Sequence, residues 1–417
     1  MLKRIAFAGL LVLTGCFSSQ DISTTNLSSV YRASDQVFHP EFYCYQYKTD
    51  SARVFVKFNT SELLYMNQGQ DEFTATFKIV CRLLESYESP VAYDTAIHVF
   101  NIPRPGVENT MKVFTLEMKV PKPQGYLVEI TLNDVKKNVS AVYFAGLDAT
   151  SEQSRNSFYA ARPGSSLPLF QNYLLPDDTV KIMHRDSTVK QLVVKYYHRD
   201  FPLSAPPFSF DVSSPFDYKY DSVFSYVPGS PVQLEREGFY QFLIDSSRTE
   251  GFTLFRFEKG FPSVTSPSLM VEAVRYLTSK REFDDLKSAT DKKAVIDKFW
   301  MAAGGSQDRT RMLIKKYYGR VQEANRLFTS FTEGWRTDRG MIFVIFGAPH
   351  IVYRSSVTES WVYGQAGNPI SLNFSFTRVN NPFSDNDFTL GRAPVYEANW
   401  HQAVDVWRQG RVYNDYN

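Results

Sequence analysis

The stretch GWRTDRGMIFVIFGAPH, residues 334–350, combines more distinctive residue types than any other part of the chain. A tryptophan, two arginines and an aspartate lie between two glycines, and an unbroken apolar run, residues 341–346, follows. The run is short, contains β-branched and aromatic residues, and ends at the turn sequence Gly347-Ala348-Pro349. This pattern predicts a tight connection that leads into a strand buried on both faces.

The glycines and short polar residues of this stretch are typical of a turn. Gly334 and Gly340 would permit backbone angles denied to other residues at the two ends of the connection. Thr337 or Asp338 would cap backbone donors within it, and Trp335 would anchor the preceding helix to the sheet. We therefore expect the motif to be a structural junction.

The charged residues allow two interpretations. In the structural one, Arg339 and Arg336 pair with Asp338 or with an acid of the preceding helical segment, for which Glu323 and Glu333 are candidates. In the catalytic one, Asp338 is a general base and Arg339 holds an anion. A catalytic site also needs a second acid or nucleophile, which the sequence does not place nearby, so the structural interpretation is favoured.

Around this motif the sequence resembles the GWxTD domain family. The motif GWRTDRG at 334–340 is preceded by YGRVQEANRLF at 318–328 and followed by a Gly-x-Pro turn and by WVY at 361–363. The likeness covers roughly residues 259–410. It implies an envelope lipoprotein of a Gram-negative lineage, with β domains ahead of the motif, and implies no particular activity. His350 departs from the family, which tends to carry an acidic residue there.

The first residues resemble a bacterial lipoprotein signal. Two basic residues precede an apolar run, residues 5–13, that is too short to span a bilayer, and the sequence Leu-Thr-Gly-Cys ends at Cys16. The resemblance implies removal of residues 1–15 and lipidation of Cys16, so that a lipid anchors the protein to a membrane. Phe17 rather than an aspartate follows, which implies the outer membrane, and the scarcity of acids after it favours the periplasmic face.

The mature chain is close to neutral. Of the 46 basic residues, Lys3 and Arg4 lie in the signal, so 44 remain against 44 acidic ones. This balance argues against nucleic acid as a partner, because phosphate binding requires a clustered positive surface. Aromatic residues make up 15% of the chain, which suits β-sheet cores and protein interaction surfaces. We expect the membrane and other envelope proteins as partners.

Hydrophobic periodicity divides the chain into successive regions. After a tether at 16–29, alternating apolar and polar residues predict an immunoglobulin-like antiparallel β-sandwich at 30–147 and a second, looser β domain at 148–259. A helical subdomain at 260–330 leads into a small mixed α/β domain at 331–417 that contains the motif. The predicted fold is multidomain, with β regions followed by an α+β region.

Local signals place three helices in the helical subdomain. Ser266 followed by Pro267 predicts the start of the first. Asp291 begins the second, which two glycines at 304–305 end, and the third begins near Ser306. The apolar stripes of these helices are expected to be packing surfaces.

The remaining cysteines, and the lack of known catalytic and metal-binding motifs, limit the chemistry that the protein could perform. Cys44 and Cys81 lie in strand-like stretches and would form a disulfide outside the cytoplasm, with two buried free thiols as the alternative. The chain contains no zinc-helix, phosphate-loop or nucleophile-elbow motif, and its six histidines are scattered, so we expect no metal and no cofactor. The sequence Asp-Asn-Asp at 385–387 lacks the later ligands of a calcium loop and predicts a polar turn.

A short motif recurs in the β regions. Aspartate followed by Ser or Thr and then Ala, Val or Thr resembles the acceptor of an O-glycosylation system for exported proteins. The acceptor residues would be Ser51, Thr95, Thr179, Ser187 and Ser222. All lie ahead of the helical subdomain, so glycans would decorate the β domains, and chance occurrence in Ser/Thr-rich loops is the alternative.

Taken with the missing catalytic motifs, the lipid signal favours a non-enzymatic function. We expect an outer-membrane lipoprotein that is a protein-interaction or accessory component of an outer-membrane assembly or secretion complex. The alternative is an envelope protein that binds or hydrolyses glycan or peptidoglycan, with Asp338 and either Glu333 or Glu359 as paired carboxylates. An open cleft around Asp338 would favour the alternative, and a buried Asp338 would favour the interaction protein.

Overall fold

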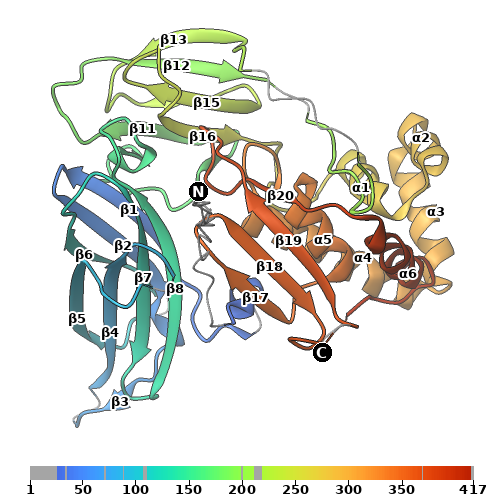
Figure 1. Cartoon of the computed structure of the whole chain (residues 1–417), viewed down its shortest axis with the longest axis horizontal. Helices are drawn as coiled ribbons and strands as arrows, with labels where there is room; N and C mark the ends of the chain where they lie inside the picture. Colours follow the sequence, from blue (N-terminus) through green and yellow to red (C-terminus); the bar gives the residue numbers. More distant parts are fainter. Residues whose placement is uncertain are drawn as a thin grey trace, which may run out of the picture.

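Two β-sheet regions precede a mixed region of helices and sheet in the computed structural model (Figure 1). The structure describes residues 26–32, 35–69, 72–87, 89–106, 110–198, 201–210, 218–368 and 370–414. The predicted signal peptide and Cys16 lie outside these residues. Within them, no helix is long and apolar enough to cross a membrane.

The first β region consists of two antiparallel sheets around one apolar core. One sheet has the order β1-β2-β6, and in the other β3-β4-β7-β8 are joined by β5, which pairs with β4. The strands are β1 (Glu41–Lys48), β2 (Ser51–Asn59), β3 (Met66–Asn67), β4 (Phe73–Leu84), β5 (Asp94–Pro103), β6 (Met111–Lys119), β7 (Gly125–Asp134) and β8 (Val139–Asp148). The inward residues of the predicted alternation, such as Phe77, Leu116 and Val128, are completely buried. Packing both sheets over this core explains the two-residue period of the sequence.

The second β region also has two sheets, of five and three strands. Their orders are β10-β16-β15-β12-β13 and β14-β11-β9. The strands are β9 (Phe158–Ala161), β10 (Tyr173–Leu174), β11 (Thr179–His184), β12 (Leu192–Tyr197), β13 (Ser222–Tyr226), β14 (Val232–Gln233), β15 (Gly238–Leu243) and β16 (Phe252–Arg256). The proline-rich segment between β12 and β13 contributes no strand in its described part, residues 201–210, because proline removes ladder donors.

The helical subdomain begins as predicted but contains one more helix than predicted. Its helices are α1 (Pro267–Ala273), the 3-10 helix η5 (Val274–Leu277), α2 (Lys280–Ser288), α3 (Lys292–Gly304) and α4 (Gln307–Phe328). The predicted caps are confirmed: Ser266 accepts from the Leu269 N–H at 3.2 Å, and Asp291 accepts from the Ala294 N–H at 2.9 Å. Helix α2 has no buried residue, and its only apolar side chains are Phe283 and Leu286, so its apolar stripe is too short to identify it from the sequence.

The apolar run after the motif is a helix, and the predicted strand at 341–346 is wrong. Residues Asp338–Phe346 form helix α5, and every residue of it is buried. Phe343 meets Phe328 of α4 with ring centroids 5.5 Å apart, and Phe346 meets Phe374 of the sheet at 5.2 Å. A helix covered on all sides needs no polar face, so its sequence lacks the 3.6-residue period and cannot be told from a buried strand by pattern alone.

A four-stranded antiparallel sheet and a terminal helix enclose α5. The elements are β17 (Ile351–Arg354), β18 (Thr358–Tyr363), β19 (Leu372–Arg378), β20 (Phe388–Leu390), the 3-10 turn η7 (Pro394–Tyr396) and α6 (Glu397–Arg408). Trp407 of α6 is completely buried and donates its indole N–H to the Ile345 carbonyl at 3.0 Å. Figure 1 shows this sheet in orange, with α4, α5 and α6 beside it.

The end of the predicted tether lies against the C-terminal sheet. The Leu27 N–H donates to the Val352 carbonyl at 2.9 Å, and the Asn26 side chain accepts from the Val352 N–H at 3.0 Å. Leu27 and Tyr31, the latter in the 3-10 turn η1 (Ser28–Tyr31), are buried in the core of that region. Residues 26–29 are therefore docked rather than free, a difference from the prediction that arises because two apolar residues are too few to form a recognisable pattern.

Candidate functional site

The GWxTD motif of this chain is a sharp connection between α4 and α5. Gly334–Arg336 form the 3-10 turn η6, and Thr337 is the N-cap of α5. The Thr337 hydroxyl accepts from the Gly340 N–H at 3.1 Å and donates to the Gly334 carbonyl at 2.7 Å. Of the two residues predicted as caps, Thr337 therefore has that role, and its side chain closes the turn onto the first turn of the helix.

The two glycines of the motif allow close contact between backbones. Neither has a positive φ, so the prediction that they permit unusual backbone angles is wrong. A Cβ at Gly340 would lie 2.7 Å from the carbonyl carbon of Gly334, and one at Gly334 would lie 2.7 Å from the carbonyl carbon of Ala324. Carbon atoms that are not bonded do not approach so closely. The glycines thus pack the backbones of α4, η6 and α5 directly on one another.

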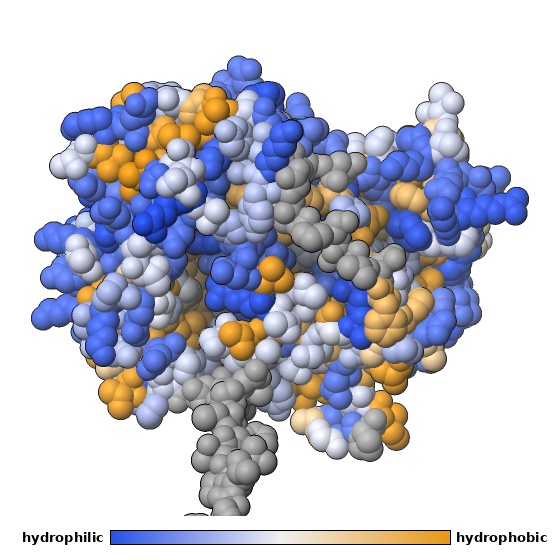
Figure 2. All heavy atoms as spheres, turned by 45° about the horizontal axis from the view of Figure 1, so that its top comes forward, coloured by the Kyte–Doolittle hydropathy of each residue, from blue (hydrophilic) through white to orange (hydrophobic). Residues whose placement is uncertain are grey.

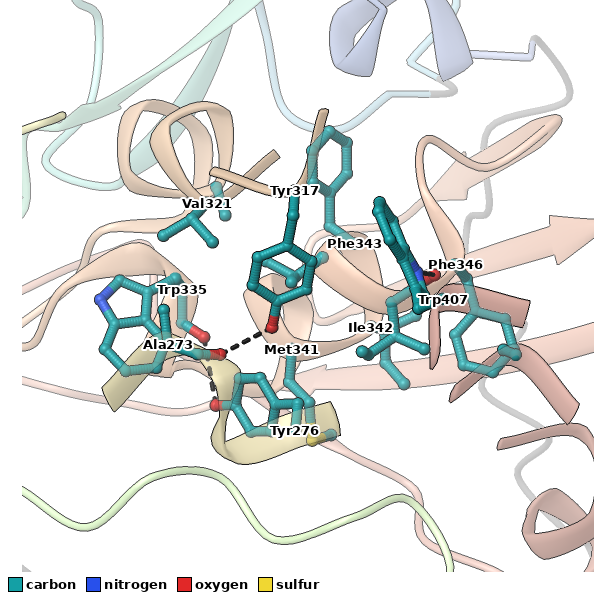
Figure 3. Close-up of a cluster of buried hydrophobic side chains, with 14 of the residues drawn as sticks. Ala273, Tyr276, Tyr317, Val321, Trp335, Met341, Ile342, Phe343, Phe346 and Trp407 are labelled. Atoms are coloured by element: carbon teal, nitrogen blue, oxygen red, sulfur yellow. Dashed lines mark hydrogen bonds between the residues drawn. The ribbon is translucent and has the colours of Figure 1, made fainter. Parts of the chain in front are cut away.

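Trp335 anchors this stack in the core, although its hydrogen bonds and ring contact join helices to one another, where the sequence predicted an anchor of a helix to the sheet. Its side chain is buried, and its backbone N–H donates to the Asn325 side chain of α4 at 3.3 Å. Tyr276 of η5 donates its hydroxyl to the Trp335 carbonyl at 3.2 Å, and Tyr317 of α4 donates to Ala273 (Figure 3). The tryptophan therefore links the first helices of the subdomain to the motif.

Asp338 is buried in an ion pair with a residue that the sequence did not suggest as its partner. It is 8% exposed, and its carboxylate pairs with the Arg392 guanidinium, one contact being 3.0 Å. The same carboxylate accepts from the Leu390 N–H of β20 at 2.7 Å. Asp338 thus connects the start of α5 to the end of the sheet.

Arg339 forms a second buried ion pair. Its guanidinium lies 3.0 Å from the Glu359 carboxylate of β18, and the two side chains are 3% and 1% exposed. Arg354 of β17 lies 3.3 Å from the same carboxylate, and the Tyr31 hydroxyl donates to it. Burial alone would raise the pKa of Glu359, but the guanidiniums of Arg354 and Arg339 outweigh it and hold that pKa below its ordinary value.

Neighbouring polar groups complete this cluster. Arg339 also donates to the backbone carbonyl of Asn386 at 2.9 Å and to its side chain. The Trp361 indole N–H donates to Glu359 at 2.6 Å. The Asp-Asn-Asp sequence at 385–387 is therefore a polar turn that holds Arg339. Among the described residues, no group of three potential ligands is placed to hold a metal ion.

Arg336 faces a cleft on the surface of the helical subdomain. It pairs with Glu272 of α1 and lies 3.2 Å from Glu333, one of the partners predicted for it. The described loop 201–210 lies over the motif here, because Ser204 donates through its N–H and hydroxyl to the Arg336 carbonyl at 3.1 and 2.8 Å. The cleft between this loop and α1, α2 and α6 has a volume of about 600 Å³.

Both cysteines of the first β region are buried free thiols. Cys44 and Cys81 lie in its core and do not form a disulfide. Of the two predicted possibilities, the structure therefore has the pair of buried free thiols. Burial raises the pKa of each thiol to about 12. Neither thiol therefore has thiolate character at neutral pH.

We predict that the native protein protects both thiols from modification. A Cys16→Ser variant, which retains only Cys44 and Cys81, should react with a chromogenic disulfide reagent at about pH 8 at less than about one hundredth of the rate of glutathione, because the thiolate is the nucleophile. The same reagent should titrate both thiols at once in guanidinium chloride. Fast release of chromophore from the native protein would contradict this burial.

The predicted glycan acceptors are divided between exposed and half-buried positions. Thr95, Thr179 and Ser187 are exposed, whereas Ser51 and Ser222 are half-buried. Thr95 lies near the start of β5, and Ser222 begins β13. A glycan at the three exposed positions would extend into solvent without displacing core residues.

The residues that sequence reasoning missed are the partners of the motif. Arg392, Glu272, Arg354 and Tyr31 complete its ion pairs and hydrogen bonds. These residues lie too far from the motif in the sequence for any helix or strand spacing to connect them to it. His350, the residue that departs from the family pattern, accepts from the Gly364 N–H at 2.6 Å, and burial lowers its pKa.

Comparison with known families identifies the domain that carries the motif. Residues 238–409 match the sequence model of the GWxTD domain. This part of the chain is therefore a GWxTD domain. No curated protein matches it.

The matched region begins earlier than the sequence resemblance suggested. It starts at 238 rather than near 259, so it includes β15 and β16. These strands pack against the C-terminal region, since Phe239 of β15 meets Phe383 with ring centroids 4.8 Å apart. Phe255 of β16 belongs to the same buried cluster.

Proposed function

We propose that this protein is a non-enzymatic lipoprotein, anchored through Cys16 to the periplasmic face of the outer membrane, that holds envelope proteins together in an assembly or secretion complex. The lipoprotein-like signal and the near-neutral mature chain support the location and the choice of protein partners. The GWxTD domain also supports this location, because the resemblance to that family implies an envelope lipoprotein.

The main support for a non-enzymatic function is that the carboxylates proposed for catalysis are paired with arginines of the same chain. A general base must reach a proton on a substrate, but the Asp338 carboxylate accepts from Arg392 and from a backbone N–H inside the fold. Glu359 and Glu333, its candidate partners in glycan hydrolysis, are themselves paired with arginines. These contacts support a structural role for all three carboxylates.

Exposed sheet edges support protein binding by the β regions. Among the described strands, β5 pairs only with β4 and β13 only with β12, which leaves one edge of each without a hydrogen-bonded strand. Ile97 and Val99 on β5, and Val223 and Phe224 on β13, are exposed apolar residues. Figure 2 shows apolar side chains gathered in separate patches among hydrophilic ones on one face. Open edges with apolar side chains recruit strands or loops of partners. We propose that the first region is an immunoglobulin-like sandwich serving this purpose.

Purification from detergent-solubilised outer membranes tests the proposal. The tagged full chain should fractionate with outer membranes and bring down at least one protein in stoichiometric amounts. A Cys16→Ser variant should lose the membrane fractionation, because it lacks the lipid acceptor. Recovery of the wild-type protein without any stoichiometric partner would contradict the proposed function.

The glycan alternative is tested with the same preparations. Wild-type protein and an Asp338→Asn variant whose circular dichroism shows native structure should both fail to release reducing sugar from peptidoglycan or envelope polysaccharide. Hydrolysis by the wild-type protein that is lost in this variant would assign a catalytic role to Asp338 and overturn the non-enzymatic proposal.

A further inference from the structure

The cleft beside the motif has the size of a ligand site. Its volume of about 600 Å³ lies within the range of sites that hold small molecules or short peptide segments. One wall is the described loop 201–210, which hydrogen-bonds to Arg336 and, through Ala205, to Arg392. The opposite wall is formed by η5, α2 and α6. The loop and the helices are thus held together on the motif, so the cleft is preformed.

The cleft carries an excess of positive charge. Glu272 is the one acidic residue among its described lining residues, and the Arg336 pair neutralises it. Arg275, Lys280 and Lys287 also line it, and none has an ion-pair partner among the described residues. An anionic ligand would therefore gain attraction without first displacing an internal carboxylate.

Helix α2 presents the two lysines together with an aromatic ring. Lys280, Phe283 and Lys287 are spaced as one helical face and all line the cleft, whereas Asp284 and Asp285 do not. The Arg275 guanidinium lies 5.5 Å from the centre of the Phe283 ring, and the Lys287 ammonium lies 5.9 Å from it. The face therefore offers an apolar surface flanked by cations.

From this arrangement we propose that the cleft binds an acidic peptide segment, containing an aromatic or apolar residue beside its carboxylates, of a partner protein. This inference rests on the proposed function as an interaction protein and names the chemistry of the partner. A peptide fits better than a saccharide, because sugar hydroxyls need polar acceptors, and the one carboxylate lining the described cleft already pairs with Arg336. The half-buried Phe283 and Phe208 offer contact to apolar side chains.

Peptide titration tests the cleft directly. The probe is a fluorescein-labelled hexapeptide of alternating glutamate and phenylalanine, added to the detergent-purified full chain and followed by fluorescence anisotropy. It should bind saturably, and a Lys280→Glu/Lys287→Glu variant should weaken binding by about tenfold through charge reversal. Both lysines are exposed, so the variant should keep the native fold.

A matched charge reversal elsewhere serves as the control. Lys298 and Lys315 are exposed and do not line the cleft, so Lys298→Glu/Lys315→Glu should change the affinity by less than about twofold. Equal affinities of the two double variants would overturn the proposal. So would binding of a lysine-for-glutamate peptide as tight as that of the acidic one, or displacement of the acidic peptide by oligogalacturonate at lower concentration than by unlabelled peptide.

The partner purification separates failure of the cleft from failure of the proposed function. Loss of a stoichiometric partner in Lys280→Glu/Lys287→Glu, together with its release from wild-type protein by the acidic peptide, supports both. Retention of the partner by this variant overturns the cleft as its binding site and leaves the proposed function intact. If the wild-type protein recovers no partner, the proposed function fails, and the inferred partner segment fails with it.

Discussion

Replacing Gly340 by alanine should severely destabilise the GWxTD region. The added Cβ would lie 2.7 Å from the carbonyl carbon of Gly334 and 2.9 Å from the Trp335 Cα. Both are backbone atoms held by buried packing, so no side chain can move aside to make room. We expect a loss of about 4 kcal/mol or more in the free energy of unfolding, the range of the most damaging core changes. Urea denaturation followed by tryptophan fluorescence measures it.

Gly319 provides the matched control. It also lies in the helical subdomain, within α4, but is exposed, and a Cβ added there would have no neighbouring atom within 4 Å. Gly319→Ala should leave the unfolding midpoint unchanged or raise the stability by up to about 1 kcal/mol, because alanine favours a helix. A Gly340→Ala protein with the wild-type midpoint would show that the backbones of η6 and α5 are not in direct contact.

The role of these glycines illustrates what local sequence can reveal. Thr337 as a cap and Trp335 as an anchor are predictable, because capping and aromatic burial are properties of a residue and its near neighbours. The glycines stand out in the sequence, but their role differs from the predicted one. A backbone contact between Gly334 and Ala324 of another element leaves no mark in the sequence apart from the glycine itself.

Helix α5 resembles a strand in sequence for a related reason. Its burial on every side removes the polar face that identifies most helices. By contrast, the alternation in β4 and β7 is readable, because their residues alternate between buried and half-buried positions. Sequence patterns thus predict the elements whose two sides differ in burial. They fail for α5, which is buried on every side, and for α2, which buries no residue.

The partners of the motif are unpredictable because they lie far along the chain. Arg392 is 54 residues from Asp338, and Tyr31 is 328 residues from Glu359. Arg392 and Tyr31 each lie in a segment whose sequence pattern reflects only the local structure of that segment. The N-terminal segment reaches the C-terminal sheet only through tertiary packing, so the tether prediction misses its docked end.

Replacing Glu359 by glutamine should be the second most damaging change. The amide has nearly the shape of the carboxylate but leaves Arg339 and Arg354 without their shared counter-charge. Removing one partner of a buried ion pair typically costs about 3–5 kcal/mol. We expect a loss of that size at neutral pH in urea denaturation. For comparison, Glu117→Gln removes a solvent-exposed pair with Arg53 and should cost about 0–1 kcal/mol.

The pH dependence of this loss identifies its electrostatic origin. The pKa of Glu359 in the folded protein is held below its ordinary value of 4.5, so its charge stabilises the fold fully above that value. This stabilisation disappears as the pH falls through the lower, folded-state pKa, where the carboxyl takes up a proton. Glutamine does not titrate. The stability difference between wild-type and Glu359→Gln protein should therefore stay constant from about pH 8 to pH 5 and shrink below about pH 4.5. A difference that does not change down to the lowest pH at which both proteins fold would mean that lost packing, not lost charge, destabilises the variant.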